Sequence, residues 1–350
     1  VSTVGMPYAA RSRLDSNSVS KVRPDLRTSA MMAVAFSRSI SPEASVLMGW
    51  YHEGRWWEAS YPPLDDHEAW KAARRPGVER GLANSARAVA ASGVTVSDTS
   101  VGGMPAVEIE PQGGAEHPHV IVTLHGSGYV MSNAASSLSG LAQVAALTGM
   151  RVLSLDYPKA PEHQWQQVHA ATDAAISALV ESLESGARWA LLGISAGGGL
   201  AVSRVLHGAF GSTGPAALAL WSPWVDLTDA GDTMTTLADA DLTLTYPSGL
   251  EVAARAFAGH TDLADPRLSP VYGDFGPAFP PTLIQEGTRT IFLSGSVRLY
   301  RALTDHGHDA TIDMYEGMPH VFQVAEIPEA VSAHARTAEF LRRHLTKEHP

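Results

Sequence analysis

The residue whose type and spacing most clearly suggest chemistry is a serine between glycines. Ser195 lies in Gly193-Ile194-Ser195-Ala196-Gly197, a G-x-S-x-G pattern that ends an apolar run and opens a helix-like segment. A sharp strand-to-helix turn of this kind lifts the serine hydroxyl above a sheet, and the glycines let neighbouring backbone pass without a clash. The pattern therefore predicts a nucleophilic serine, although serine and glycine are also ordinary turn residues.

A glycine-rich loop lies about seventy residues before this serine. The stretch "HGSGYVMSN" (125–133) directly follows the apolar run "HVIVTL". Backbone N–H groups in such a loop, together with one at the helix N-terminus, can form an oxyanion hole. We expect the N–H groups of Gly126, Ser127 and Ala196 to do so. His125 is interpreted as a residue that fixes the loop by hydrogen bonds.

Five ordered motifs resemble the hormone-sensitive-lipase-like branch of the α/β hydrolases. They are "HGSGY", "DYPKAPEH", "GISAGGG", "DPRLSPVYGD" and "YEGMPHVF", and the resemblance covers about residues 75–345. It implies a serine carboxylesterase with a Ser–His–acid triad, an α/β-hydrolase fold and a helical cap. The sequence departs from the family pattern at Ser127, where a glycine is usual, and at Ile194, where an acidic residue is usual.

His320 is the predicted general base. It lies in a loop between the last predicted strand and the closing helical segment, and the chain order, serine before histidine, fits this fold. The other histidines include two close pairs, at 117/119 and 306/308, which lack carboxylate partners at metal-ligand spacing. We expect no metal and no cofactor.

The third member of the triad is missing from its expected position. The family's acid lies just past the penultimate strand, where this sequence has Thr290, thirty residues before His320. A threonine cannot carry the negative charge that orients the histidine and stabilises its protonated form.

Three explanations remain open at this point. In the first, another carboxylate substitutes, with Glu286 favoured over Asp313, Glu316 and Asp305. In the second, Thr290 holds His320 by a neutral hydrogen bond, with slow hydrolysis. In the third, the site serves an elimination, an acyl transfer or a cyclisation rather than hydrolysis.

The elements that must position these residues follow an α/β pattern. Short apolar runs alternate with helix-length segments, which indicates a mostly parallel sheet covered by helices on both faces. Predicted strands are 119–124, 151–155, 189–194, 216–221, 281–285 and 310–315, with 103–111 as an antiparallel strand before them; predicted helices include 67–92, 169–185 and 328–345.

The remaining segments are interpreted as cap material. Residues 1–100 form cap helices and a lead-in, and residues 101–350 form the hydrolase core with a cap insertion at about 226–266. Tyr129, Trp221 and Trp224 are expected to line the substrate pocket. A group of aromatic and methionine residues in the cap either packs it onto the core or contributes to the pocket: Met31, Met32, Trp50, Tyr51, Trp56, Trp57 and Tyr61.

Composition excludes several other classes of protein. The 350 residues contain no cysteine, which excludes disulfides and thiolate catalysis, and the formal net charge of −11 argues against a nucleic-acid partner. No stretch reaches the ~18 apolar residues of a membrane span, and the N-terminal stretch lacks an apolar signal core. A cytoplasmic location is expected, and a homodimer is an open possibility.

The sequence thus predicts a serine carboxylesterase for small to medium apolar esters. The alternative is a tailoring lyase, cyclase or acyltransferase on the same fold, and a third interpretation is a binding protein derived from an esterase. Joint retention of Ser195 and His320 argues against the binding protein, which needs neither.

Overall fold

One eight-stranded sheet organises the computed structural model, which describes residues 39–54, 61–208, 210, 213–276 and 278–346. The strand order is β1-β2-β4-β3-β5-β6-β7-β8. β1 and β2 are antiparallel to each other and β2 is antiparallel to β4, whereas all other neighbours are parallel. The strands are β1 (Val94–Val101), β2 (Met104–Pro111), β3 (Val120–Leu124), β4 (Arg151–Leu155), β5 (Trp189–Ile194), β6 (Leu218–Trp221), β7 (Thr282–Gly287) and β8 (Ala310–Tyr315).

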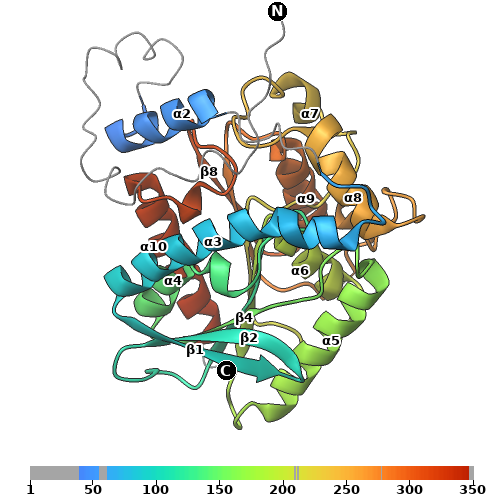
Figure 1. Ribbon diagram of the computed structural model, residues 1–350. Coiled ribbons are helices and arrows are strands. Elements are labelled where there is room, and N and C mark those ends of the chain that lie inside the picture. Colours follow the sequence, from blue (N-terminus) through green and yellow to red (C-terminus); the bar gives the residue numbers. More distant parts are fainter. Residues whose placement is uncertain (1–38, 55–60, 209, 211–212, 277, 347–350) are drawn as a thin grey trace, which may run out of the picture.

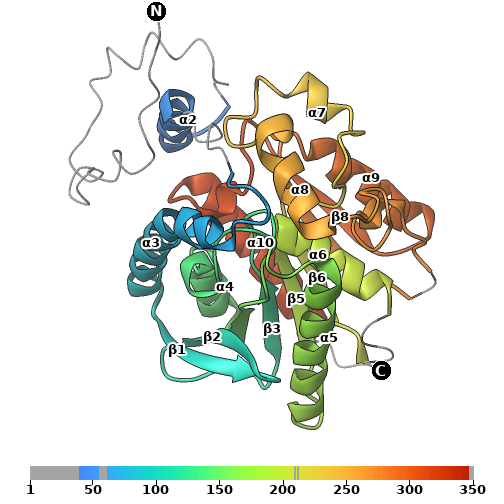
Figure 2. The same ribbon diagram turned by 45° about the vertical axis from the view of Figure 1, so that its right-hand side comes forward.

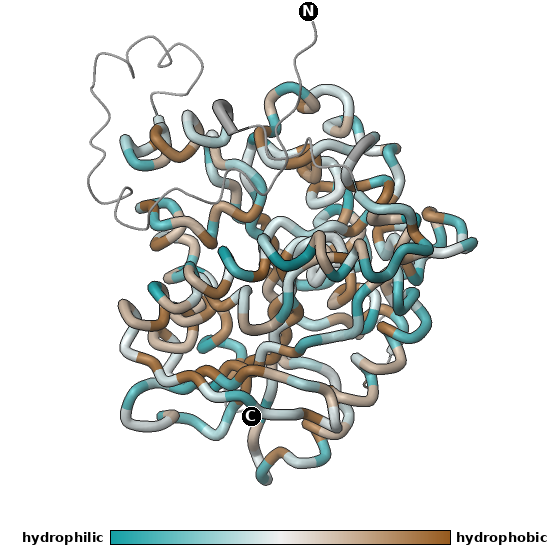
Figure 3. Tube along the Cα trace, viewed as in Figure 1, coloured by the Kyte–Doolittle hydropathy of each residue, from teal (hydrophilic) through white to brown (hydrophobic). Residues whose placement is uncertain are grey.

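Helices cover both faces of this sheet (Figures 1 and 2). In β5 the side chains alternate between two cores: Leu191 packs with α5 and α6, and Leu192 packs with α4 and α10. Figure 3 shows hydrophobic residues concentrated along the central strands and hydrophilic residues along α3, of which only Trp70 and Ser85 are buried. The helices are α2 (Pro42–Gly54), α3 (His67–Ser92), α4 (Leu141–Thr148), α5 (Trp165–Ser182), α6 (Ala196–Leu206), α7 (Thr233–Thr236), α8 (Glu251–Ala258), α9 (Leu293–Asp305) and α10 (Pro328–Leu345).

The predicted fold class is confirmed, and the core strands lie where the apolar runs placed them. The antiparallel position of β2 is confirmed as well. Sequence reasoning missed β1, because its residues "VTVSDTSV" are mostly solvent-exposed and form no apolar run. β1 is held instead by pairing along its whole length with β2, through a turn in which Gly102 and Gly103 have φ of +54° and +83°.

The segments interpreted as cap material do not all lie at one end of the molecule, because residues 94–100 belong to β1 of the core sheet. In Figures 1 and 2, α2, α7 and α8 all lie at the end opposite the β1–β2 hairpin. Arg74 of α3 ties this region to the core by donating to the carbonyl oxygens of Val130 and Ala160 and pairing with Glu162. Met31, Met32, Trp56 and Trp57 lie outside the described residues, and Tyr61 stacks on Trp70 at 5.1 Å between ring centroids.

Within the described segments, no helix combines the length and apolar character needed to span a bilayer.

Candidate active site

Ser195 stands at the turn between β5 and α6 with a strained backbone. Its φ of +53° lies in the left-handed region that non-glycine residues rarely adopt. Two hydrogen bonds hold the turn: the Ser195 N–H donates to the Trp221 carbonyl at 2.9 Å, and the Trp224 N–H donates to the Ser195 carbonyl at 2.8 Å. Such strain persists only where the surroundings fix it, and it commonly marks a functional turn.

The glycines around Ser195 are required by close backbone approach. A Cβ on Gly197 would collide with the carbonyl oxygen of Leu124, and one on Gly199 would collide with that of Trp224. The start of α6 therefore packs directly against the end of β3 and the loop after β6. Any larger residue would push the nucleophile turn out of place.

His320 lies in the loop after β8 and reaches the serine. Its Nε2 is 2.9 Å from Ser195 Oγ, and its ring meets Phe292 edge-on, with centroids 4.9 Å apart. Desolvation lowers the pKa of His320 to about 3, so the ring is neutral near pH 7 and can accept a proton. The structure thus brings together two residues that lie 125 positions apart in the sequence.

No carboxylate of the described residues completes this pair. Although part of the His320 surface is exposed, its Nδ1 is buried and has no hydrogen-bond partner in the described part of the chain. Thr290 is fully buried, and its hydroxyl accepts a hydrogen bond from the N–H of Phe292 at 3.2 Å instead of meeting His320. Asp313 pairs with Gln285 and Arg336, and Asp305 pairs with Arg301.

The prediction of Glu286 as the triad acid is wrong for this structure. Its carboxylate accepts hydrogen bonds from Ser296 Oγ at 2.8 Å and from the Gly287 N–H at 3.0 Å. Glu286 still lies within β7, and the direction of its side chain toward α9 is fixed by the alternation of the strand. Burial raises the pKa of this carboxyl to about 7.

The glycine-rich loop lies against the nucleophile. A Cβ on Gly126 would come within 3.0 Å of the Ser195 Cβ, and Ser127 has a φ of +76°. Ala196 is the first residue of α6, so its N–H has no acceptor within the helix.

His125 has the structural role predicted for it. Its ring is fully buried, stacks on Tyr157 at 4.2 Å and lies 3.0 Å from the Gly126 carbonyl through Nδ1. The Tyr157 hydroxyl donates to the His125 carbonyl at 2.6 Å. The start of the loop is therefore fixed by side chains beneath it.

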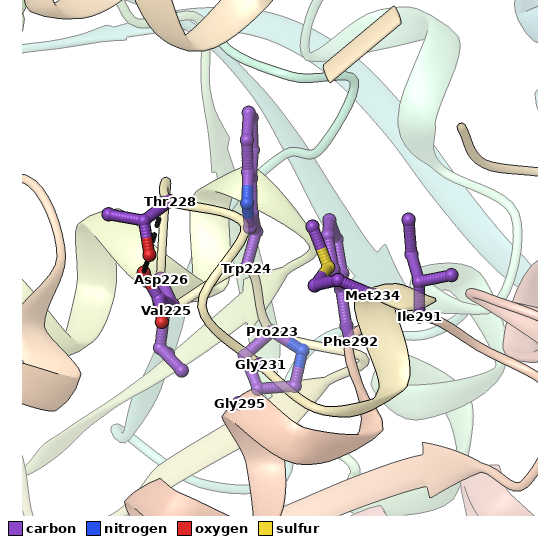
Figure 4. A pocket seen from close by; sticks show the side chains of 10 residues that line it. All are labelled: Pro223, Trp224, Val225, Asp226, Thr228, Gly231, Met234, Ile291, Phe292 and Gly295. Atoms are coloured by element: carbon purple, nitrogen blue, oxygen red, sulfur yellow. Dashed lines mark hydrogen bonds between the residues drawn. The ribbon is translucent and has the colours of Figure 1, made fainter. Parts of the chain in front are cut away.

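A very small cavity lies between the loop after β6, α7 and the segment that leads into α9 (Figure 4). It measures about 10 Å³, which is room for about one water molecule, and its lining includes Trp224, Met234, Ile291 and Phe292. Ser195 and His320 are not among the lining residues. Trp224 and Phe292 stack at 5.6 Å, and Phe292 also contacts His320, so the cavity adjoins the histidine through this ring.

Of the three predicted pocket residues, Trp224 lines this cavity and Trp221 does not. The placement of Trp221 in the pocket is wrong: its side chain faces the opposite side of the sheet, and its indole N–H donates to Thr337 at 3.0 Å. Because Trp221 belongs to β6, strand alternation sets that direction. Tyr129 is 1% exposed and stacks on Phe257 of α8 at 3.8 Å, which joins the oxyanion loop to the 226–266 insertion.

Sequence reasoning also missed Phe292 and Ser222, which surround His320 and its loop. Phe292 carries no motif, and Ser222 is identifiable only through its contact with the N–H of Val321. Among the described residues, no cluster of three or more His, Cys, Asp or Glu could hold a metal ion.

The fold and the Ser195–His320 pair define an α/β hydrolase. A family model for the alpha/beta hydrolase fold matches residues 121–324. LipR of Mycobacterium tuberculosis is 31% identical over 266 residues, covering 75% of this chain and 84% of LipR. An acetyl-hydrolase of Streptomyces hygroscopicus is 32% identical over 229 residues, covering 63% of this chain and 75% of that protein.

Solved structures agree with this assignment. The crystal structure of an esterase from the bacterial hormone-sensitive lipase family matches with a TM-score of 0.74 and 30% identity, over 87% of this chain and 99% of that one. The chain therefore belongs to the α/β-hydrolase fold family, in its hormone-sensitive-lipase-like branch. It is a carboxylic ester hydrolase.

Proposed function

We propose that the chain hydrolyses esters through a covalent acyl-enzyme on Ser195. Ser195 Oγ attacks the ester carbonyl while His320 Nε2 takes the hydroxyl proton, and the N–H groups of Gly126, Ser127 and Ala196 stabilise the oxyanion. The intermediate collapses, and His320 returns the proton to the departing alcohol. A water molecule then attacks the acyl-enzyme with His320 as base and releases the acid. The 2.9 Å contact between Ser195 Oγ and His320 Nε2 carries this proposal.

The mechanism uses a serine–histidine dyad. The unpartnered Nδ1 leaves the His320 imidazolium without a carboxylate to stabilise it. Neutralising the triad acid costs a serine protease about 10⁴-fold in kcat. We therefore expect slow hydrolysis compared with complete triads of the same branch.

The proposed substrates are small apolar esters with short acyl groups. The cavity of about 10 Å³ that Phe292, the neighbour of His320, helps to line leaves little room, and its wall of Trp224, Met234 and Phe292 is apolar. One relative is itself named an acetyl-hydrolase. Because a larger acyl chain needs movement of these side chains, acetate esters are expected to be preferred over butyrate and octanoate.

Hydrolysis of p-nitrophenyl acetate, butyrate and octanoate tests this function. We expect slow turnover that decreases with acyl length and is lost in Ser195→Ala. A fluorophosphonate probe is expected to label Ser195 in the unmodified protein and not in His320→Ala. Turnover that persists in Ser195→Ala, or equal rates for all three esters, would contradict the proposal.

A further inference from the structure

Two side chains of the 226–266 insertion hold the backbone just before Phe292. Asp241 accepts the N–H of Ile291 through Oδ2 at 2.9 Å, and the Thr233 hydroxyl donates to the Ile291 carbonyl at 2.7 Å. Asp241, Thr233 and Ile291 are all buried, and buried backbone groups must be paired. Both polar backbone groups of Ile291 are therefore bonded to side chains that lie 50 and 58 positions earlier in the chain.

The two side chains are themselves fixed by further hydrogen bonds. Oδ1 of Asp241 accepts three bonds from the turn that follows it: the N–H and the hydroxyl of Thr243, both at 2.8 Å, and the N–H of Leu244 at 3.0 Å. The Thr233 hydroxyl also accepts the N–H of Ser294 at 2.9 Å, and the Ser294 hydroxyl accepts the N–H of Thr233 at 3.0 Å. The oxygens of Asp241 thus have separate tasks, because Oδ1 bonds within the insertion and Oδ2 bonds to the segment after β7.

This segment leads directly to the catalytic histidine. Phe292 follows Ile291, and its ring meets the His320 ring edge-on, with centroids 4.9 Å apart and an angle of 87° between the planes. Phe292 also stacks on Trp224 at 5.6 Å. Since aromatic pairs favour particular edge-to-face and stacked arrangements, the position of Phe292 limits how the imidazole can turn.

We propose that Asp241 and Thr233 are positioning residues for His320. They hold both backbone groups of Ile291, which sets where the next residue, Phe292, meets the histidine ring. In a complete triad the carboxylate both orients the imidazole and stabilises its cation. In this chain the two insertion residues supply the orientation by packing, while the stabilising charge is absent among the described residues. This inference rests on the proposed dyad mechanism.

The same hydrogen bonds border the small cavity. Ile291 and Phe292 line it, and so does Met234, which follows Thr233 (Figure 4). Loss of the bonds to Ile291 is therefore expected to loosen this wall as well as the histidine. A change in acyl preference would accompany the change in rate.

Thr233 offers a matched pair of substitutions. Thr233→Val keeps the shape of the side chain and removes the hydroxyl that bonds to Ile291 and Ser294. Thr233→Ser keeps that hydroxyl and removes the methyl group. A loss of activity in Thr233→Val that Thr233→Ser avoids would therefore identify the hydrogen bonds, and not the packing of the methyl group, as the cause.

Asp241→Asn tests the second side chain. Its single amide oxygen can keep the bonds to Thr243 and Leu244, and the amide nitrogen then faces the Ile291 N–H, from which it cannot accept. Thr243→Ala is the control for this variant. It removes one hydrogen bond to Oδ1 of the same carboxylate and leaves the bond from Ile291 to Oδ2 in place.

The experiment measures the rate at which a fluorophosphonate labels Ser195, with kcat and KM for p-nitrophenyl acetate, below the thermal unfolding midpoint of each variant. We expect the labelling rate and kcat to fall roughly 10- to 100-fold in Thr233→Val and Asp241→Asn, with KM nearly unchanged, because small displacements of a reacting group cost rates of this order. The butyrate-to-acetate ratio of kcat/KM is expected to rise in the same two variants. Thr233→Ser and Thr243→Ala are expected to stay within about threefold of the unmodified protein.

Several results would overturn the positioning role. They are equal rates in Thr233→Val and Thr233→Ser, equal rates in Asp241→Asn and Thr243→Ala, and a lower unfolding temperature in Thr233→Val and Asp241→Asn with an unchanged labelling rate. Should Asp241→Asn fail to fold, the contrast between the two Thr233 variants decides the question.

Failure of the proposed function remains distinguishable from failure of this inference. Labelling of Ser195 needs only a serine activated by His320, whereas ester turnover also needs deacylation. Labelling without turnover would overturn the hydrolytic proposal, while the ratio of labelling rates among the variants still decides the positioning role. Normal turnover with equal rates in Thr233→Val and Thr233→Ser would overturn the positioning role alone. Absence of labelling in the unmodified protein would overturn the dyad and this inference together.

Discussion

The serine and the histidine of this site are held in different ways. Ser195 is fixed by backbone: its N–H donates to the last residue of β6, its carbonyl accepts from the loop after β6, and glycines allow contacts that no other residue permits. His320 is fixed by side chains, with Phe292 against its ring and Ser222 bonded to the N–H of the next residue. Residues around Ser195 can therefore hardly be substituted without moving the backbone, whereas the side chains that support His320 can be replaced one at a time.

This difference is consistent with the sequence, which keeps the G-x-S-x-G turn and has Thr290 where we expected the family's acid. Thr290 is buried and accepts a local hydrogen bond from the N–H of Phe292, so the loop folds without a carboxylate. We expect the missing carboxylate to affect chemistry rather than folding, because His320 Nδ1 has no partner among the described residues. Substitutions near His320 are therefore expected to change kcat the most.

Restoring an acid is expected to give the largest change. Thr290→Asp places a carboxylate in the loop after β7, two residues before Phe292, which contacts His320. We expect this carboxylate to accept the Nδ1–H of His320 and stabilise the imidazolium. A triad acid is worth about 10⁴-fold in a serine protease, so kcat for p-nitrophenyl acetate is expected to rise at least tenfold and up to that value. Thr290→Asn is the neutral control. An equal rate in both variants would show that position 290 does not reach His320.

Removing the nucleophile is expected to have a smaller effect than in a complete triad. In a serine protease the serine is worth about 2 × 10⁶ and the acid about 3 × 10⁴, and the two are not additive. A Ser–His dyad without its acid is thus expected to retain a rate enhancement in kcat of about 10², and Ser195→Ala should abolish this enhancement. The ratio of Ser195→Ala to unmodified kcat measures this factor. In a Thr290→Asp background the same substitution should cost far more.

A side chain added where two backbone segments are in close contact is expected to destabilise the turn that holds Ser195. Gly197→Ala forces a Cβ against the Leu124 carbonyl, and such overpacking costs about 1–3 kcal/mol or more. Gly77→Ala is the matched control, since Gly77 lies in α3, where an added Cβ would meet no atom within 4 Å, and the change should gain about 1 kcal/mol. Urea denaturation measures both. Similar stability of the two variants would mean that the turn is not held by close packing.

The two tryptophans near β6 provide a test of acyl preference. Trp224→Phe enlarges the cavity that Trp224 and Phe292 line, and space for one methylene is worth roughly tenfold or more in discrimination. The butyrate-to-acetate ratio of kcat/KM should rise by that factor. Trp221→Phe should leave the ratio unchanged and lower stability by about 1 kcal/mol through its lost bond to Thr337. A changed ratio in Trp221→Phe instead would refute the assignment of the pocket wall.

A pH dependence of stability is expected from Glu286. Its folded-state pKa is raised from 4.5 to about 7, so folding favours the protonated form. The unmodified protein should lose up to about 3 kcal/mol of stability as pH rises from 4.5 to 7, and Glu286→Gln should not. Urea denaturation at pH 5 and pH 8 measures the free energy of unfolding of both proteins. Buried Asp241 is present in both, so its own pH-dependent contribution cancels in the difference. If the stability of both proteins changed with pH in the same way, a raised pKa of Glu286 in the folded protein would be contradicted.

Much of the fold could be predicted because apolar periodicity marks buried elements. β4, β5 and β8, together with α3 and α10, have the bounds that the sequence predicted, since each is either an apolar strand or a helix with clear ends. β1 could not be predicted, because an exposed strand held by its partner shows no apolar run. Trp221 and Trp224, three residues apart, could not be told apart from the sequence, because a strand and the loop after it direct side chains to different faces.

The sequence alone determined the nucleophile turn, the glycine-rich loop and the histidine after the last strand, because these depend on local backbone geometry that specific residue types permit. It also predicted that Thr290 stands where the family's acid is usual. Only the tertiary structure decided what surrounds His320. Ser222 and Val321 are 99 positions apart along the chain, and no local pattern links them. Their contact exists because β6 and β8 lie in one parallel sheet and the segments that follow them leave it at the same edge.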